Sequence, residues 1–300
     1  MTLLVMGSVN RDITARLPEF PQPGETLLAT ASQTATGGKS ANQAVAAALV
    51  GAEAQLIARC GSDAAGAEAV NALREAGVHV DAVAPGRGAQ GMAFITVRAD
   101  GENTIVVVPG ANAELQAQDC PEALLDQADW ILLSLEVPLD TVLEVAARAR
   151  AAGTRVALNA SPLSEQTLDL RHVDLVIVNE GEADHLLADA GAAHRHSQDP
   201  TPEDPTGALG IETLIVTRGA AGASIHEAGL EPVHVPSVEV EAVDTSGAGD
   251  AFAGALLGRL TCGDSLKTAA TIASRFAAAT TTRFGAQASY PRDFTMATDS

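Results

Sequence analysis

Cysteine is scarce in this chain of 300 residues, and its distribution excludes two classes of protein. The three cysteines, Cys60, Cys120 and Cys262, are odd in number, far apart and without C-x-x-C or Cys/His spacing. A disulfide framework or a structural zinc site is therefore not expected. The pattern fits a chain that works in a reducing cytoplasm.

Basic residues are also few, with Lys+Arg at 18 against Asp+Glu at 38, for a net charge of -20. Such a field repels nucleic acid and anionic membrane surfaces, so neither is an expected partner. No apolar run approaches the ~18 residues of a membrane span, and the first residues lack the basic region of a signal peptide. A polyanionic substrate would have to be held by local donors.

Hydrophobic residues make up 46% of the chain, and their spacing predicts the fold class. Short continuous apolar runs alternate with helical patterns, as in strands buried on both faces. We predict an α/β fold with a mostly parallel central sheet and helices on both faces. The predicted strands are residues 3–9, 54–58, 130–134, 155–158, 175–178 and 214–217, and the predicted helices are residues 40–51, 63–76, 139–152 and 251–260.

Two segments, at about residues 11–37 and 90–109, break this alternation. The first lacks helical periodicity and carries the turn Pro21-Gln22-Pro23-Gly24, and the second has two β-rich runs joined by Asp100-Gly101-Glu102-Asn103. Such a polar, glycine-containing connection is a hairpin signal. We expect the two segments to pair into a small second sheet, a lid on a single domain that spans residues 1–300.

A polar stretch at residues 188–210 contains three prolines and the pair His194 and His196. A metal site there would need more ligands, and no carboxylate framework surrounds the histidines. We predict an exposed loop with a short helix, and assign it no role.

The strongest functional motif is Asp244-Thr245-Ser246-Gly247-Ala248-Gly249-Asp250, which leads into a predicted helix. Glycines on either side of Ala248 allow successive N–H groups to point at one spot, and the helix N-terminus completes an anion hole. Asp250 lies in the first helical turn. A carboxylate beside an anion hole suits a phosphoryl group passing the hole while the carboxylate accepts the proton of an attacking hydroxyl. The alternative is a glycine-rich loop before an acidic first turn.

A second motif is Gly37-Gly38-Lys39-Ser40-Ala41-Asn42. It resembles the end of a phosphate-binding loop of the G-x-x-x-x-G-K-[ST] type, but Gln33 stands where that motif needs glycine, so we reject this interpretation. The glycine backbone could instead lie against a sugar, with Asn42 facing it from the first turn. The alternative is a glycine turn with Ser40 as N-cap.

Two further groups of polar residues directly follow predicted strands, where ligands bind in parallel sheets. Asn10 and Asp12 follow the first strand and could clamp neighbouring hydroxyls, or could be turn residues. Asn179 and Glu182 open a helix after the strand at 175–178. Glu182 could hold water around a Mg²⁺ ion bound to ATP, or could simply cap the helix.

The order and placement of these motifs resemble one known family. Gly-Ser-x-Asn-x-Asp, Pro-x-Pro-Gly-Glu-Thr, Gly-Gly-Lys-x-x-Asn-Gln-Ala, Asn-Glu-x-Glu-Ala and Asp-Thr-x-Gly-Ala-Gly-Asp all occur here, from Val5 to Pro291. Together they resemble the ribokinase-type (PfkB) carbohydrate kinases. The resemblance implies a ribokinase-like fold, transfer of the ATP γ-phosphate to a sugar hydroxyl, and a homodimer formed through the lid.

The resemblance also implies roles for individual residues. Asp250 would be the base, with Gly247, Ala248 and Gly249 as the anion hole. The sugar would contact Asn10, Asp12, Gly38, Lys39, Asn42, Glu136 and Asp250. The ATP site would be lined by Asn179, Glu182, Thr217, Gly219 and Gly249, with Glu182 supporting Mg²⁺ through water. A monovalent cation, usually K⁺, would lie against Asp244, Ser246, Thr280, Arg283, Gly285 and Ser289.

Two departures from the family pattern bear on the choice of sugar. Ser40 stands where glycine is frequent, and Asn159-Ala160-Ser161-Pro162 stands where Asn-Pro-x-Pro is usual. We expect D-ribose as the acceptor, and fructose, a keto-deoxy acid or a nucleoside as alternatives. Aromatics are only 3% of the chain, which argues against the base pocket of a nucleoside kinase. A sugar-binding protein without catalysis is a further alternative, because fold does not fix function.

Overall fold

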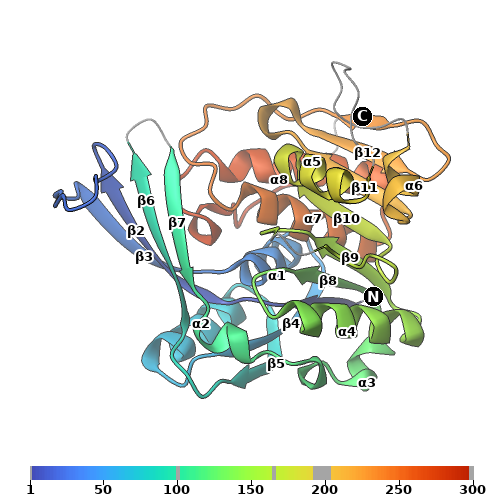
Figure 1. Cartoon of the computed structure of the whole chain (residues 1–300), viewed down its shortest axis with the longest axis horizontal. Coiled ribbons are helices and arrows are strands. Elements are labelled where there is room, and N and C mark those ends of the chain that lie inside the picture. Colours follow the sequence, from blue (N-terminus) through green and yellow to red (C-terminus); the bar gives the residue numbers. More distant parts are fainter. Residues whose placement is uncertain (1, 99–101, 164–166, 192–203, 297–300) are drawn as a thin grey trace.

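A computed structural model of the chain describes residues 2–98, 102–163, 167–191 and 204–296 (Figure 1). Its main sheet has the strand order β13-β12-β11-β10-β9-β8-β1-β4-β5. All neighbours are parallel except β11–β12 and β12–β13. The strands are β1 (Thr2–Met6), β4 (Glu53–Cys60), β5 (His79–Pro85), β8 (Ala128–Ser134), β9 (Arg155–Asn159), β10 (Leu175–Asn179), β11 (Thr213–Thr217), β12 (Ala223–Glu227) and β13 (Val233–Val235).

Helices cover both faces of this sheet, as predicted. Successive residues of a strand point to opposite faces, so Leu3 and Val5 of β1 pack into one core while Leu4 and Met6 pack into the other. The first core is closed by α1 (Lys39–Leu49), α2 (Ala64–Glu75), α7 (Ala248–Thr261) and α8 (Leu266–Thr280). The second is closed by α3 (Glu122–Leu125), α4 (Leu139–Ala152), α5 (Glu180–Asp189) and α6 (Pro205–Leu209).

The predicted small second sheet is confirmed. It has the order β3-β2-β6-β7 and extends from one side of the main body (Figure 1). Its strands are β2 (Asn10–Leu17), β3 (Ala31–Gly37), β6 (Gly91–Arg98) and β7 (Asn103–Val108). Strands β6 and β7 pair antiparallel, as a hairpin requires, although residues 100 and 101 of the predicted turn lie outside the described residues.

The first predicted strand is too long at its C-terminal end. Residues 3–9 were expected to form it, but β1 ends at Met6, and Gly7 with φ 153 begins the connection to β2. The reason is that this stretch serves two sheets, so the chain must change direction between Met6 and Asn10. The histidine pair at residues 194 and 196 lies outside the described residues. Within the described ranges, no helix has both the length and the apolar character that crossing a membrane requires.

Candidate active site

The predicted site residues gather at one edge of the main sheet, where its parallel strands end. Ser134, Asn159, Asn179 and Thr217 are the last residues of β8, β9, β10 and β11. The connection from β1 to β2 lies at the same edge and carries Asn10 into the small sheet. This is the edge at which parallel α/β sheets bind ligands.

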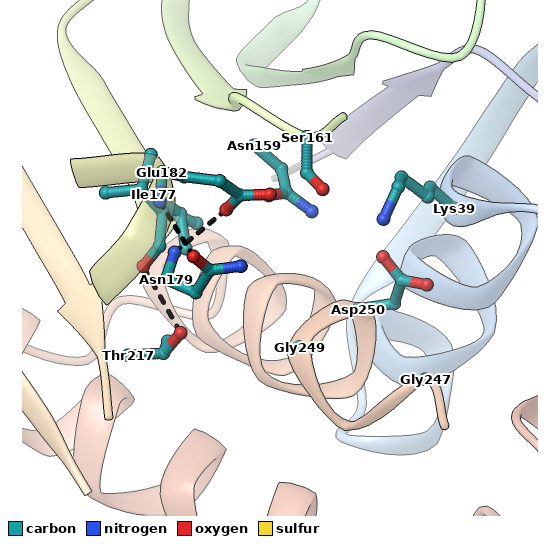
Figure 2. A pocket seen from close by; sticks show the side chains of 11 residues that line it. Lys39, Asn159, Ser161, Ile177, Asn179, Glu182, Thr217, Gly247, Gly249 and Asp250 are labelled. Carbon is teal, nitrogen blue, oxygen red and sulfur yellow. Dashed lines mark hydrogen bonds between the residues drawn. The ribbon is translucent and has the colours of Figure 1, made fainter. Parts of the chain in front are cut away.

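Asp250 lies in the first turn of α7 and is held by two amides from α1. The Asn42 Nδ2 group donates to one carboxylate oxygen at 3.1 Å, and Gln43 Nε2 donates to the other at 3.2 Å. Burial raises the pKa of Asp250, while the Lys39 ammonium and these two amides act in the opposite direction. Figure 2 shows the Lys39 amine pointing toward the carboxylate.

The start of α7 leaves backbone donors beside this carboxylate. The Ala248 N–H donates to the Thr245 carbonyl at 3.2 Å. In the part of the chain that the structure describes, no acceptor pairs with the N–H groups of Gly247, Gly249 and Asp250. First-turn N–H groups have no partner within the helix, and with the helix dipole they attract anions. Of the three residues predicted for the anion hole, Gly247 and Gly249 thus have unpaired N–H groups, Ala248 is already paired, and Asp250 adds a further donor.

Helix α1 begins against the β1–β2 connection, and the capping suggested for Ser40 is wrong. Ser40 is fully buried, and its hydroxyl bonds the Met6 carbonyl at 3.2 Å and the Ser134 hydroxyl at 2.9 Å. The helix N-cap position is Gly38. The Lys39 N–H donates to Glu136 Oε2 at 3.2 Å instead. The extra hydroxyl of Ser40 is thus already bonded within the protein, to Met6 and Ser134.

Four carboxylates, those of Asp12, Glu136, Glu182 and Asp250, interact electrostatically with Lys39 or with one another. Glu136 Oε2 also accepts the Ser8 hydroxyl at 2.6 Å, which joins β8 to the β1–β2 connection. Burial raises the pKa of Asp12 from 3.8 to about 7, and repulsion by Glu136 and Asp250 adds to the shift. Burial lowers the pKa of Lys39, but the carboxylates of Asp250, Glu136 and Glu182 outweigh this effect and raise it.

Three acceptor atoms in this region are buried without a protein partner, namely Asp12 Oδ1, Asn42 Oδ1 and Gln43 Oε1. A buried acceptor without a hydrogen bond is costly, so such atoms fit a ligand that supplies donors. Several hydroxyl groups on a compact molecule would meet this requirement. The residues brought together here are Asn10, Asp12, Gly38, Lys39, Asn42, Glu136 and Asp250.

A polar cavity of about 150 Å³ opens from Asp250 toward β10 and β11. Figure 2 shows Lys39 and Asp250 on one side and Asn179, Glu182 and Thr217 on the other. Asn179 and Glu182 form a reciprocal capping box, in which Asn179 Oδ1 accepts the Glu182 N–H at 2.8 Å and Glu182 Oε2 accepts the Asn179 N–H at 2.9 Å. The capping interpretation of Glu182 is therefore confirmed, and its role toward Mg²⁺ stays a prediction.

A second cavity of about 510 Å³ adjoins the first and shares Thr217 and Gly249 with it. Its walls are largely apolar and include Val238, Val240 and Phe252. Predicted residue Gly219 lies on its rim, in the turn after β11. A polar cavity that continues into an apolar one matches a nucleotide, whose phosphates and base differ in the same way.

The residues predicted to bind a monovalent cation come from the loop before α7 and from the end of α8 and the segment that follows it. Asp244 joins its two loops, because Oδ1 accepts the Ser246 N–H and Oδ2 accepts the Gly285 N–H, both at 2.9 Å. Thr280 and Ser289 are buried there, and the carbonyl of Thr280, the last residue of α8, accepts the Arg283 N–H at 3.4 Å. A site built of oxygens at a helix C-terminus fits a hard, weakly charged cation.

Sequence reasoning missed several residues of the site. Gln43 holds Asp250, and its signal was a polar residue beside Asn42 in an alanine-rich helix. Tyr290, the chain's single tyrosine, donates its hydroxyl to the Gly247 carbonyl at 3.0 Å. Val238, Val240 and Phe252 line the apolar cavity, and no local pattern distinguished them from core residues.

A carboxylate beside unpaired helix amides, between unpartnered buried acceptors and a cavity with a polar and an apolar part, is the arrangement expected of a phosphotransferase. Comparison of the sequence with known protein families identifies the family. The sequence matches the family described as pfkB family carbohydrate kinase over residues 2–293, and the chain belongs to that family. It is therefore a phosphotransferase with an alcohol group as acceptor.

Individual relatives cover almost the entire chain. It is 37% identical to a ribokinase of Haemophilus influenzae, over 97% of this chain and 95% of that protein. It resembles the structure of a Thermotoga maritima ribokinase, with a TM-score of 0.85, 31% identity and coverage of 97% and 96%. It also resembles the Arabidopsis thaliana ribokinase complexed with ribose and ATP, with a TM-score of 0.83, 28% identity and coverage of 98% and 99%.

Proposed function

We propose that this protein phosphorylates D-ribose with ATP to give D-ribose 5-phosphate and ADP. The observation that carries the proposal is the Asp250 carboxylate, held by two amide donors next to the unpaired N–H groups of α7. The curated relatives named ribokinase support ribose as the sugar. The solved complex with ribose and ATP, which shares this fold, supports the same pair of substrates.

In the proposed reaction, the sugar hydroxyl oxygen attacks the γ-phosphorus while its proton passes to Asp250. The bond between that phosphorus and the bridging oxygen of ADP breaks in line. Charge on the phosphoryl oxygens is stabilised by the Gly249 and Asp250 N–H groups and by the Lys39 ammonium, because phosphoryl transfer depends mainly on positioning and electrostatics. Glu182 would hold water around Mg²⁺, which neutralises phosphate charge when bound.

A sugar panel tests the proposed function. ADP release would be followed with D-ribose, 2-deoxyribose, fructose, a keto-deoxy acid and a nucleoside as acceptors. We expect the highest kcat/KM with D-ribose. If another acceptor is turned over and ribose is not, that acceptor would be the substrate in place of ribose. If ribose binds without ADP release, the protein would be a sugar-binding protein without catalysis.

Asp12 gives a prediction on pH. Its pKa of about 7 lies above its ordinary value of 3.8, so the group stabilises the free protein at low pH and loses this effect as the pH rises through 7. Sugar hydroxyls that donate to the carboxylate favour its ionised form. The Kd for ribose should therefore increase as the pH falls below 7, approaching tenfold per pH unit. Calorimetry between pH 5.5 and 8.5 measures this, and a flat profile in the wild type would contradict it.

Asp12→Asn provides the control for that profile. The amide does not titrate, so its ribose affinity should be weaker but nearly independent of pH over the same range. An identical pH dependence in both proteins would assign the titration to another group.

A second prediction concerns the cation. Enzyme dialysed into Na⁺ buffer should gain rate when K⁺ is added at constant ionic strength, because a larger cation between the 244–246 and 280–289 loops would hold the anion hole in place. Asp244→Asn should abolish the response, since its carboxylate joins the two loops. Equal rates in Na⁺ and K⁺ would contradict the site, and constant ionic strength removes general screening as a cause.

The small sheet supplies the proposed lid and dimer contact. Strand β7 leaves Ile105, Val106, Val107 and Val108 at least 41% exposed, which is unusual for neighbouring apolar residues. A second copy of the chain would cover these residues in a dimer. Closure of the lid over bound sugar would exclude water and so limit hydrolysis of ATP by water. Residues 1–300 would then act as one domain with a movable lid. The cytoplasmic location expected from the free thiols stays a prediction.

A further inference from the structure

The backbone of Val9, where the chain leaves the main sheet for the small one, is held on both sides by two buried side-chain amides. The Val9 N–H donates to Asn112 Oδ1 at 2.9 Å, and Gln90 Nε2 donates to the Val9 carbonyl at 2.5 Å. Asn112 Nδ2 also donates to Asn10 Oδ1 at 2.7 Å. Gln90 and Asn112 are 2% and 1% exposed, so water does not compete for these bonds.

Backbone groups fix the orientation of both amides. A backbone N–H can only donate, so the atom of Asn112 that faces Val9 must be its oxygen, and the nitrogen must face Asn10. By the same logic, Gln90 Oε1 accepts the Gly61 N–H at 2.9 Å, which leaves Gln90 Nε2 for the Val9 carbonyl. Asn10 must then accept through its oxygen, which leaves its Nδ2 group as the donor available to a ligand.

The neighbouring acceptor has the opposite character. Asp12 lies two residues along β2, on the same side of the strand, and its Oδ1 has no partner. Asn10 and Asp12 thus offer one donor and one acceptor side by side. Two adjacent hydroxyls match this pair if one accepts from Asn10 and the other donates to Asp12.

The two amides also mark both ends of the β6–β7 hairpin. Gln90 directly precedes β6, and Asn112 follows β7 in the 3₁₀ turn Gly110–Glu114. A Cβ added at Gly91 would lie 2.3 Å from Asn112 Nδ2 and 2.6 Å from Asn10 Oδ1, so glycine is needed for this amide pair to form. The Gln90 N–H is bonded in turn to Asp63 Oδ2 at 3.0 Å, which anchors the group to the start of α2.

We propose that Asn112, supported by Gln90, is a positioning residue that presents the Asn10 amide to the sugar as a donor and ties the base of the small sheet to that contact. This inference rests on the proposed function of Asn10 as a sugar ligand. It predicts that a change at Asn112 acts on sugar binding through Asn10, without direct contact between Asn112 and the sugar.

The test is Asn112→Asp. The carboxylate still accepts the Val9 N–H but cannot donate to Asn10, so the Asn10 amide turns and presents its oxygen to the sugar. We expect KM for ribose to rise about 10- to 100-fold, as for a lost hydrogen bond with an unpaired group. KM for ATP should stay within about twofold of the wild type, since Asn112 lies on the sugar side. Asn71→Asp, the same chemical change on the exposed face of α2, should alter neither value.

A double-mutant cycle separates positioning from general destabilisation. In an Asn10→Ala background, Asn112→Asp should raise KM for ribose no further, because the amide through which it acts is gone. An equal additional increase in that background would overturn the proposal. If Asn112→Asp does not fold, Gln90→Met, which removes the donor to the Val9 carbonyl, takes its place in the cycle. Absence of ribose turnover in the wild type would refute the proposed function itself, a different outcome from additivity.

Discussion

Replacing Asp250 by Asn should lower kcat about 10²- to 10⁴-fold, the usual contribution of a general base. The side chain keeps its size, so Asn42 and Gln43 still surround it, but it can no longer take up the hydroxyl proton. Ribose binding should change little, because most of its expected contacts come from other residues. ADP release measures the first effect, and calorimetry with ribose measures the second.

A matched variant and a fold check make that result decisive. Asp169→Asn makes the same change at an exposed carboxylate that pairs with Arg171, and it should leave kcat unaltered. The unfolding midpoint of each variant shows whether lost activity reflects lost structure. If folded Asp250→Asn protein kept more than about a tenth of the wild-type kcat, Asp250 would not be the base.

Gly38→Ala should reduce kcat/KM for ribose by about 10²-fold, the effect expected from a displacement of about 1 Å in a site. Gly38 has φ 94, and a Cβ there would lie 2.8 Å from the Asn10 nitrogen and 2.9 Å from the Ser8 oxygen. Both are backbone atoms, so no side chain can move aside. Either the β1–β2 connection or the start of α1 must shift, which displaces Asn10 or Lys39 from the sugar.

Gly153→Ala separates this steric effect from backbone strain. Gly153 ends α4 with φ 85 and has open space around its added Cβ, so alanine there costs only about 1 kcal/mol of conformational strain. Its kinetics should match the wild type. Comparable losses of kcat/KM in both variants would mean that strain, and not the close contact of Gly38 with residues 8–10, explains the effect.

The sequence predicted the fold class well because parallel strands that are buried on both faces consist of continuous apolar runs. Such runs can be recognised within a short stretch of sequence. The boundary at Met6 was wrong because apolar character continues to Val9, although the chain there already turns toward the second sheet. Only contacts from distant segments, such as Asn112 to Val9, specify that turn. Local patterns cannot contain this information.

The residues of the site likewise divide into those that local sequence patterns indicate and those that depend on contacts with distant segments. Glycine-rich turns next to polar residues indicated the Gly38 and Gly247 loops, because this local combination of residues is typical of ligand-binding loops. The role of Ser40 could not be read locally, because it depends on Ser134 from a strand almost a hundred residues away. The apolar cavity next to Gly249 was also invisible in the sequence, because its valines and Phe252 resemble core residues in any single segment.

The chain's only tyrosine and only tryptophan occupy very different surroundings, which has a practical consequence for spectroscopy. Tyr290 is buried with its hydroxyl on the Gly247 carbonyl, whereas Trp130 lies near the beginning of β8, under the guanidinium of Arg155. Tyrosine absorbance therefore reports on the loop that carries Gly247 and on the packing of Tyr290 against Phe276 of α8. Tryptophan emission, from the opposite end of the sheet strand, reports on unfolding of the main body. One unlabelled sample thus carries two separate optical probes.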